Sequence, residues 1–442
     1  MAADSSVTAP DDQKKGARTV VGTFVLHLRP VRVPAAAIRF THTFGLGGAS
    51  LVLLVLLAVT GSLLMFAYTP VPGDAYASIE RLEGEVLFGA FVRALHHWSA
   101  NLLVLVAALH LLRVFFTGGF LAGRELNWIV GLVLFGTIAA SAFTGYLLPW
   151  DQLAFWAATI VTGMAGYVPL VGPALASLLR GGEEIGPATL GTYYALHTQW
   201  LPALLFAGAG FHFWRVRRAK GVVLPPDAAR DEQGRPVQVP FLPELLWREV
   251  AATFVVLAGV TLFAALVRAP LGAAANPGLS PNPTKAPWYF LGFQELLVHL
   301  HPLFAIVVVP ALGALALLAL PYFRWGSDEP RGAWFLSPLG RRTAGWAALA
   351  GGLSTLLAVL LDRSDGSVNS GAGIVLRGLV PVAALVALCA GGFRLLRRRW
   401  GATRLEATQA LFVFLAAAFV VLTLTGIFLR GAGMALVWPW HR

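Results

Sequence analysis

The sequence predicts an all-α fold, a polytopic transmembrane helical bundle of about nine helices. Hydrophobic residues make up 57% of the 442 positions and charged residues only 12%, whereas soluble domains carry about 25% charged residues. A hydrocarbon core of about 30 Å requires about 20 apolar residues per helix. Nine runs approach this length, at residues 44–67, 90–114, 128–148, 191–214, 249–268, 300–322, 343–361, 374–394 and 407–429. The seventh run is short and is interrupted by Gly351 and Gly352.

The basic residues give the bundle an orientation. With the N-terminus in the cytoplasm, most of the 33 Lys and Arg fall on cytoplasmic segments, including the clusters at 215–220 and 397–399. The positive-inside rule requires this asymmetry, so topology and membrane lipid explain the net charge of +11, and nucleic acid is not needed. Residues 1–20 contain no apolar stretch typical of a signal peptide. We expect a multi-pass protein of the bacterial cytoplasmic (inner) membrane.

Composition divides the chain into five segments. They are a cytoplasmic lead-in at 1–40, four helices at 41–220, a cytoplasmic linker rich in proline at 221–248, further helices at 249–325, and additional C-terminal helices at 326–442. Two connections on the outer side, 149–190 and 269–299, are too long for simple turns. Each mixes Pro and Gly with apolar residues, which is typical of structured surface segments that cover a site.

Four histidines inside the apolar runs carry the predicted chemistry. An ionisable side chain in a membrane span costs a few kcal/mol and usually marks function. His96 and His110 are fourteen residues apart, and His197 and His212 are fifteen apart, so each pair is separated by about 21–23 Å and faces roughly one side of its helix. Both helices run inward from the outer side. We therefore predict two bis-imidazole haems, the outer one between His96 and His197 and the inner one between His110 and His212.

Glycines and arginines at matching heights support this prediction. Glycine lets a flat macrocycle approach the backbone, and arginine suits haem propionates. The glycines again come in pairs fourteen apart. The expected haem-packing glycines and propionate-binding arginines are Gly47, Gly61, Gly131, Gly145, Arg93 and Arg113. The alternative is that the histidines only form hydrogen bonds in the packed interior and the glycines are ordinary helix contacts.

Several short motifs resemble the cytochrome b family of bc/bf-type complexes. They are His96–Ala100, Thr117–Phe120, Arg124–Leu126, Pro149–Gln152 and Leu196–Thr198. The spacing of fifteen between the second pair of histidines resembles the bf-type branch, and residues 276–325 resemble the separate subunit IV of that branch, here fused to the same chain. The resemblance covers about residues 40–325. It makes 249–325 a subunit IV-like part with the quinol site, and the last three helices match no motif.

This resemblance implies a proton-translocating activity, that of a subunit of a quinol:cytochrome c (or plastocyanin) oxidoreductase. Quinol is oxidised at the outer face, and one electron goes to a Rieske iron–sulfur protein. The other electron passes through the outer and inner haems to quinone near the cytoplasmic face, which generates a proton gradient. The resemblance further implies a c-type cytochrome subunit and a homodimeric complex.

The same resemblance implies two quinone sites. Residues of the inner site are Arg217 and Arg218, for which anchoring by the positive-inside rule is the alternative. Residues of the outer quinol site are Pro149, Trp150, Asp151, Pro287, Trp288, Tyr289, Glu295 and His299.

The chain departs from the family pattern at three positions. Pro287 stands where the family's Pro-Glu-Trp-Tyr motif has its proton-accepting glutamate, and Thr192 replaces an arginine expected to contact a haem propionate. Gly45 replaces the cysteine that attaches an extra haem in the bf-type branch. The only cysteine of the chain is Cys389. We therefore expect two non-covalent b-type haems and no covalent haem.

Replacement of the glutamate by Pro287 requires another proton acceptor. If residues 288–299 are helical, Trp288 and Glu295 lie on one face, and His299, one turn further on, is placed to accept or relay the proton. An apolar quinone pocket would raise the pKa of the Glu295 carboxyl toward the range useful for proton transfer. The alternative is that Glu295 only anchors the next helix at the membrane surface.

Two other classes of protein compete with this interpretation. A di-haem b-type membrane anchor of a dehydrogenase would also pass electrons, but such anchors are shorter and lack the outer segments. A non-redox polytopic protein, such as a transporter or an assembly subunit, predicts broken helices with polar residues at mid-membrane. In this sequence the polar residues of the spans are paired histidines.

Overall fold

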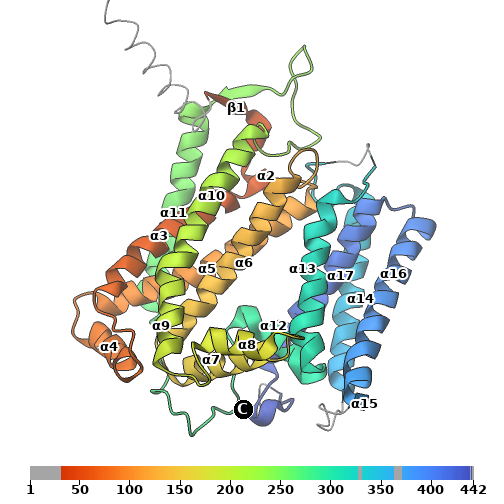
Figure 1. The fold of residues 1–442 in the computed structure, drawn as a ribbon. Helices are drawn as coiled ribbons and strands as arrows, with labels where there is room; N and C mark the ends of the chain where they lie inside the picture. Colours follow the sequence, from red (N-terminus) through yellow and green to blue (C-terminus); the bar gives the residue numbers. More distant parts are fainter. Residues whose placement is uncertain (1–30, 327–330, 363–370, 439, 441–442) are drawn as a thin grey trace, which may run out of the picture.

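The computed structural model describes residues 31–326, 331–362, 371–438 and 440, and the architecture is almost entirely helical (Figure 1). Eight helices of the described residues are long and apolar enough to cross a membrane, so the chain is a multi-pass membrane protein. They are built on α3 (Leu46–Met65), α5 (Gly89–Phe116), α6 (Glu125–Leu147), α11 (Leu246–Leu266), α13 (Val309–Ala319), α14 (Pro338–Leu361), α16 (Val380–Arg399) and α17 (Arg404–Phe428). The stretch at 1–20 that we examined for a signal peptide lies outside the described residues.

The fourth expected helix, at 191–214, is present but is composite. It consists of α9 (Pro187–Ala195), a single π-helical turn, η2 (Leu196–Trp200), and α10 (Leu201–Arg218). The backbone stays right-handed and helical through both junctions, so the three pieces form one continuous rod. It is not among the eight apolar spans, and its last piece, α10, ends in three arginines.

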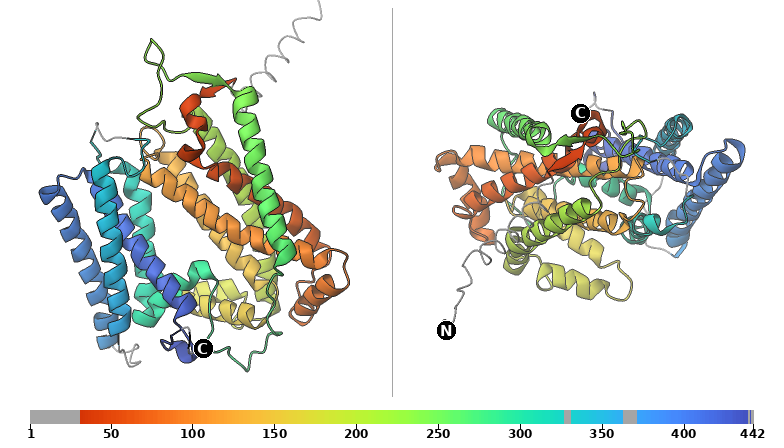
Figure 2. Two further views of the ribbon diagram at one scale, coloured as in Figure 1. Left: turned by 180° about the vertical axis from the view of Figure 1, so that it is seen from behind. Right: turned by 90° about the horizontal axis from the view of Figure 1, so that it is seen from above.

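The first four long helices form a bundle at one side of the molecule. This bundle contains α3, α5, α6 and the α9–α10 rod, with α11 packed against α3 and α5. Viewed from behind, α14, α16 and α17 stand beside the bundle as a second group (Figure 2). The Trp128 indole of α6 donates to the Leu317 carbonyl at 2.8 Å, and the Gln409 amide of α17 donates to the Phe115 carbonyl at 2.9 Å.

Close packing within the second group explains the glycines of the expected seventh span. At Gly351 of α14, an added Cβ would lie 2.2 Å from the Phe414 carbonyl oxygen of α17. Glycine therefore lets the two backbones touch. The interruption seen in the sequence is a close contact between α14 and α17, and α14 continues through it as a helix of 24 residues.

Short elements cover the two ends of the bundle. At one end, β1 (Arg32–Pro34) pairs antiparallel with β2 (Gln238–Pro240) of the linker, next to α2 (Phe40–Thr43). The opposite end carries α4 (Pro72–Gly84), α7 (Gln152–Ala165), α8 (Gly172–Arg180), α12 (Trp288–His299) and α15 (Gly371–Ile374). The two long connections expected on the outer side thus contain α7, α8 and the whole of α12, all at this second end.

Candidate functional site

The structure brings the four histidines together in the two expected pairs. His96 of α5 faces His197 of the π turn, with ring centroids 6.2 Å apart. His110 of α5 faces His212 of α10, with ring centroids 6.4 Å apart. In both pairs the ring planes are inclined by 77°. The pairs follow one another along the same two rods, so the bundle contains two equivalent sites at different depths.

The spacing of the imidazoles fits one metal ion between each pair. A metal–imidazole bond is about 2 Å long, and the ring centre lies about 1.1 Å further on, so two axial imidazoles should have centroids about 6.3 Å apart. Within the described residues, no group of three or more His, Cys, Asp and Glu side chains is placed to hold a metal ion. A metal held by two imidazoles must therefore bring its other ligands with it, as the iron of a haem does.

Hydrogen bonds fix the orientation of the rings in the first pair. The Thr60 hydroxyl donates to the Leu56 carbonyl at 2.8 Å, so it accepts from Nδ1–H of His96 at 2.9 Å. Nδ1–H of His197 donates to the Ser141 carbonyl at 3.0 Å. Both histidines then keep the lone pair on Nε2, the nitrogen that an axial ligand uses, and the hydrogen bonds act as the supporting contacts that metal-binding histidines require.

The π turn explains why fifteen residues separate His197 from His212. The Leu201 amide donates to the Leu196 carbonyl five residues earlier, and such a turn adds one residue to a helix. Fifteen residues along this rod therefore advance like fourteen along α5, which returns the second histidine to within about 40° of the first. Pro202, which has no amide hydrogen to donate, follows directly. Sequence reasoning missed this turn, although the odd spacing and the proline pointed to it.

Each of the four expected glycines lies against one of the four imidazoles. An added Cβ would lie 3.3 Å from Cε1 of His110 at Gly47 and 3.1 Å from Cε1 of His96 at Gly61. On α6, the corresponding distances are 3.6 Å to His212 at Gly131 and 2.5 Å to His197 at Gly145. A Cβ at Gly145 would therefore displace the His197 ring. Gly47, Gly61 and Gly145 thus keep space for the rings, whereas at Gly131 a Cβ would make an ordinary contact.

The two expected propionate arginines are buried and already have protein partners. Arg93 forms an ion pair with Glu83 and donates to the carbonyls of Ala269 and Pro270 at 3.1 and 2.6 Å. Arg113 donates to the His42 carbonyl at 3.0 Å, and its Nη2 lies 3.0 Å from Nε2 of the same histidine. Both arginines lie near the ends of α5. Their guanidinium groups connect the bundle to the α4 region at one end and to α2 at the other.

The two outer connections meet at Asp151. Its side chain caps α7 by accepting from the Ala154 amide at 2.9 Å, and it accepts from the Gly272 amide of the second connection at 2.8 Å. Trp150 is buried next to it. Pro149 lies between the C-cap of α6 and this buried pair. The Pro149–Asp151 motif thus joins the two segments that the sequence placed over one site.

The other expected outer residues form the start of α12. Pro287 precedes the helix, and the Trp288 indole donates to the Asn101 side chain of α5 at 2.8 Å. Burial raises the pKa of the Tyr289 hydroxyl, which keeps it protonated. Phe290 packs edge-to-face on Phe143 of α6 with centroids 6.0 Å apart. This end of α12 therefore contacts the histidine-bearing bundle.

Glu295 corrects one sequence-based expectation. Its side chain is fully buried and forms an ion pair with Arg430, which follows α17. Burial raises the pKa of this carboxyl, but hydrogen bonds from His299 and Arg430 outweigh it and hold the pKa below its ordinary value. The expected rise in pKa is therefore wrong, because an arginine from a distant segment neutralises the carboxylate. The only sequence signal was an isolated arginine just beyond the last apolar run.

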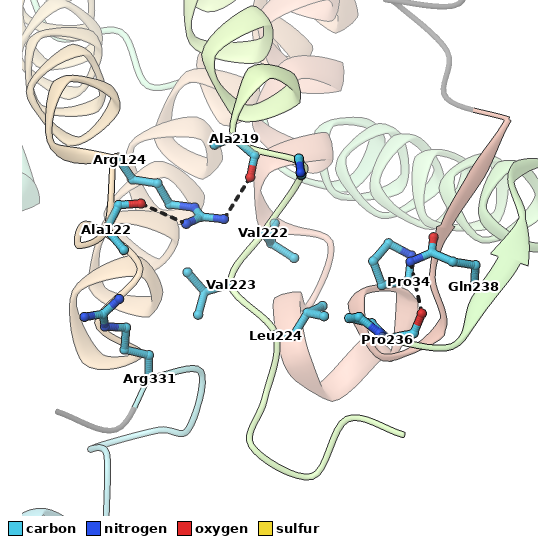
Figure 3. A pocket seen from close by; sticks show the side chains of 11 residues that line it. Pro34, Ala122, Arg124, Ala219, Val222, Val223, Leu224, Pro236, Gln238 and Arg331 are labelled. Carbon is cyan, nitrogen blue, oxygen red and sulfur yellow. Dashed lines mark hydrogen bonds between the residues drawn. The ribbon is translucent and has the colours of Figure 1, made fainter. Parts of the chain in front are cut away.

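The expected inner residues lie at the end of α10. The guanidinium of Arg218 stacks over the Trp214 ring at 5.4 Å from its centroid. A nearby cavity of about 440 Å³ is lined by other basic residues, Arg124, Lys220 and Arg331 (Figure 3). Arg124 donates to the Ala219 carbonyl at 3.0 Å and so caps the end of α10. Arg217 and Arg218 do not line this cavity.

Two facing histidine pairs inside a membrane helical bundle are typical of proteins that bind haem. The family Cytochrome b/b6/petB matches residues 33–220. The chain is 42% identical to cytochrome b6 of Rippkaea orientalis and 43% identical to cytochrome b6 of Synechococcus sp. (strain CC9605). Both matches span 173 residues, which are 39% of this chain and 78% and 79% of those relatives. The chain therefore belongs to the cytochrome b/b6 family, and this membership implies that it binds b-type haem.

A solved structure resembles nearly the whole chain. It is a chain described as "Hyperthermophilic respiratory Complex III", with a TM-score of 0.65 and 22% sequence identity. The match covers 94% of this chain and 98% of the other. At this level of identity, the match shows a shared fold that includes the C-terminal helices.

Proposed function

We propose that this protein is the quinol-oxidising, di-haem cytochrome b subunit of a bc/bf-type complex. The observation that carries the proposal is the pair of histidine sites, with imidazole centroids 6.2 and 6.4 Å apart, one behind the other along α5 and the α9–α10 rod. His96 and His197 would hold the outer haem, and His110 and His212 the inner one. Fourteen residues of α5 correspond to about 21 Å, most of the thickness of a membrane core.

The residues of the bundle orient and enclose these groups. The hydrogen bonds from Nδ1 of His96 and His197 direct Nε2 into the site. Gly47, Gly61 and Gly145 leave the space that the rings require, and Gly131 lies at an ordinary contact distance from His212. When bound, the two haems would supply one-electron redox chemistry at two depths in the membrane.

The outer quinol site would lie where the Pro149–Asp151 motif and the start of α12 cover the outer end of the bundle. Asp151 holds the two connections together. Trp288 ties α12 to α5, and Phe290 ties it to α6. The site is thus built from rigid, largely apolar elements with a few polar groups, as ligand pockets are. Arg217 and Arg218 remain the proposed residues of an inner quinone site, with membrane anchoring as their alternative role.

The family resemblance supports the rest of the proposal. One electron from quinol would go to a Rieske iron–sulfur protein and the other across the bundle, so that the complex, with a c-type cytochrome subunit and in homodimeric form, conserves energy as a proton gradient. We place the N-terminus in the cytoplasm and the chain in the bacterial inner membrane. Gly45, with φ of +63°, occupies the position of the bf-type cysteine, and Cys389 lies in α16 of the second helix group. Both haems would accordingly be non-covalent.

The test is a haem analysis of the purified chain and of the complex that copurifies with it. We expect two b-type haems per chain, both reducible by a soluble quinol, and full extraction of haem by acidified acetone. One haem per chain, or spectra without a b-type signal, would contradict the di-haem assignment. Haem retained on this chain in a denaturing gel would contradict non-covalent binding. Reduction by a dehydrogenase substrate in place of quinol would instead identify a dehydrogenase anchor.

A further inference from the structure

At the outer histidine pair, a threonine precedes the packing glycine on each of the two neighbouring helices. On α3 the two residues are Thr60–Gly61, beside His96. On α6 they are Thr144–Gly145, beside His197. Both threonines are buried, with exposed fractions of 3% and 4%. In each case the glycine makes room for one imidazole, and the threonine before it brings a hydroxyl to the same ring.

The Thr60 hydroxyl is an acceptor that its own helix holds in place. Its proton is directed at the Leu56 carbonyl at 2.8 Å, with the Leu57 carbonyl at 3.3 Å. Its oxygen is then free to accept from Nδ1–H of His96 at 2.9 Å. The acceptor of this axial imidazole is therefore a side chain, which a single substitution can remove without any change to the backbone.

Thr144 repeats this arrangement at His197 with a longer contact. Its hydroxyl donates to the Ala140 carbonyl at 2.9 Å, and its oxygen lies 3.3 Å from Nδ1 of His197. The same Nδ1–H donates to the Ser141 carbonyl at 3.0 Å, so a carbonyl and a hydroxyl share it. Removal of the Thr144 hydroxyl should therefore weaken the hydrogen bonding of this ring without abolishing it.

At the inner pair, apolar residues stand in the places of the two threonines. The residues before the inner packing glycines are Leu46 and Val130, each fourteen positions before one of the threonines. Fourteen positions return to within about 40° of the same helix face. Nδ1 of His212 is buried beside the Asn127 backbone and, among the described residues, has no hydrogen-bond partner of ordinary geometry. The two histidine pairs therefore differ in the groups that surround Nδ1.

A hydrogen bond from Nδ1–H changes the properties of the opposite ring nitrogen. The acceptor draws the proton toward itself, which makes Nε2 a stronger electron donor to a metal. A stronger axial donor stabilises ferric iron more than ferrous iron, so the reduction potential of a haem bound there falls. The same hydrogen bond limits rotation of the ring. Hydroxyl acceptors at the outer pair alone thus make the two sites chemically unequal.

We propose that Thr60 and Thr144 are positioning residues that act through Nδ1 of the outer imidazoles and lower the reduction potential of the haem bound between them. Leu46 and Val130 exert no such effect at the inner pair. This inference rests on the proposed function and deepens it, because a lower potential at the outer site favours passage of electrons from the outer site to the inner one. The threonines neither gain nor lose a proton in this role.

The experiment begins with Thr60→Val in the assembled complex, which replaces the hydroxyl by a methyl group of similar size. The readouts are a potentiometric titration of the two haems by absorbance and the electron paramagnetic resonance spectrum of the oxidised haems. We expect the potential of the outer haem to rise by up to about 59 mV, which is a tenfold change in equilibrium constant for one electron. Its low-spin resonance should shift as well. Thr60→Ser, which keeps the hydroxyl, should restore both, and Thr144→Val should give a smaller rise.

Two further variants separate this role from a general effect on packing. Thr137 is a buried threonine of α6 whose hydroxyl donates to the Val133 carbonyl at 2.8 Å and, among the described residues, contacts no histidine. Thr137→Val is therefore the matched control and should leave both potentials at their wild-type values. Val130→Thr is the converse test, because it brings a hydroxyl to the inner pair at the place that corresponds to Thr144. The potential of the inner haem should then fall.

The results that would overturn the inference differ from those that would overturn the proposed function. An unchanged outer potential in Thr60→Val, with two haems bound, would show that the hydroxyl does not tune the outer site. Equal rises of both potentials would show a general change of the bundle instead. If Thr60→Val loses its outer haem, Thr144→Val decides, since it keeps the Ser141 acceptor, and an unchanged potential there would refute the proposal. If the wild-type chain binds fewer than two b-type haems, the proposed function itself fails, and this inference fails with it.

Discussion

The histidine bundle and the α12–α17 cluster of Glu295, His299, Asp362 and Arg430 solve the same problem, a buried ionisable group, in different ways. In the bundle, the groups are imidazoles placed at helical spacing on two continuous rods, so their pairing follows from two segments of sequence. In the cluster, a carboxylate from α12 is neutralised by an arginine some 135 positions later, and an imidazole is bridged to the end of a third helix. The first arrangement is set by helix geometry and the second only by tertiary contact.

The comparisons with known proteins also differ between these two regions of the chain. The match to cytochrome b6 of Rippkaea orientalis spans 173 residues, and the family match ends at residue 220. The match that covers 94% of the chain is one of fold, at 22% identity. This difference indicates that the histidine bundle and the α12–α17 cluster place different constraints on the amino-acid sequence. A histidine that must lie on one face of a helix fixes the spacing between the histidines and the positions of the neighbouring glycines. An ion pair requires only that two opposite charges lie close together in the folded chain.

The largest expected effect is loss of the inner haem when one of its ligands is removed. His212→Ala should leave only the outer haem, because one imidazole is insufficient for a bis-imidazole site, and electrons should then remain on the outer haem. Haem content and the reduced spectrum of the purified chain measure this. His97→Gln is the matched control, since the His97 ring packs edge-to-face on Trp98 at 4.8 Å. Two haems per chain after each single ligand substitution would break the assignment.

The second effect tests the cluster by stability. Arg430→Gln leaves Glu295 buried without its cation, which costs about 3–5 kcal/mol. The double variant with Glu295→Gln should recover much of this loss, because no charge remains buried. Thermal denaturation of the detergent-solubilised complex, followed by haem absorbance, measures both.

The stability of the Arg430→Gln variant should depend on pH, and the direction of this dependence can be predicted. Without Arg430, the pKa of the buried Glu295 carboxyl rises above its unfolded value. The destabilisation should therefore be full at neutral pH and should shrink as pH falls through the raised pKa, because protonation removes the unpaired charge. In wild type the pKa is lowered, and the ion pair should be lost only at still lower pH. A loss of stability in Arg430→Gln that does not change with pH would contradict this account.

Gly145→Ala should have an intermediate effect. The new Cβ would lie 2.5 Å from Cε1 of His197, so the ring or the backbone must move, and overpacking of this kind costs about 1–3 kcal/mol. Because the displaced ring is a proposed axial ligand, the outer haem should also shift its spectrum or be lost in part. Gly131→Ala is the matched control, since its Cβ would lie at an ordinary 3.6 Å from His212. Equal effects of the two substitutions would show that the glycines do not make room for the rings.

The predictable part of the site is the part that periodicity determines. A rise of about 1.5 Å and a turn of about 100° per residue predict the length of each span and the helix face on which each residue lies. The same geometry matches the spacing of Gly47 and Gly61 to that of His110 and His96. The comparisons with known proteins also confirmed the family resemblance. The positions on α5 were accurate because that helix is regular over 28 residues.

The unpredictable part depends on contacts between distant segments. The π turn at His197 is a local irregularity that the fifteen-residue spacing implied but did not specify. The pairing of β1 with β2 places Arg32 opposite Pro240. Neither short segment has a sequence pattern that predicts the other as its partner. The sequence predicted a raised pKa for Glu295 because an apolar pocket was its only expected surrounding. In the structure, the hydrogen bonds from Arg430 and His299 lower this pKa instead.

The smallest effect concerns an exposed ion pair and sharpens the contrast with Glu295. Arg39 and Asp227 contact each other at 2.8 Å, but their side chains are 45% and 73% exposed. An exposed pair gains little, since water solvates both charges when they separate, and Arg39→Ala should cost at most about 1 kcal/mol. That cost should vanish in high salt, because exposed charges are screened over about 3 Å at 1 M. Arg430→Gln should be nearly insensitive to the same salt. Both are arginine–carboxylate pairs at hydrogen-bond distance, so a comparable loss in the two variants would show that burial does not govern the strength of the Glu295 pair.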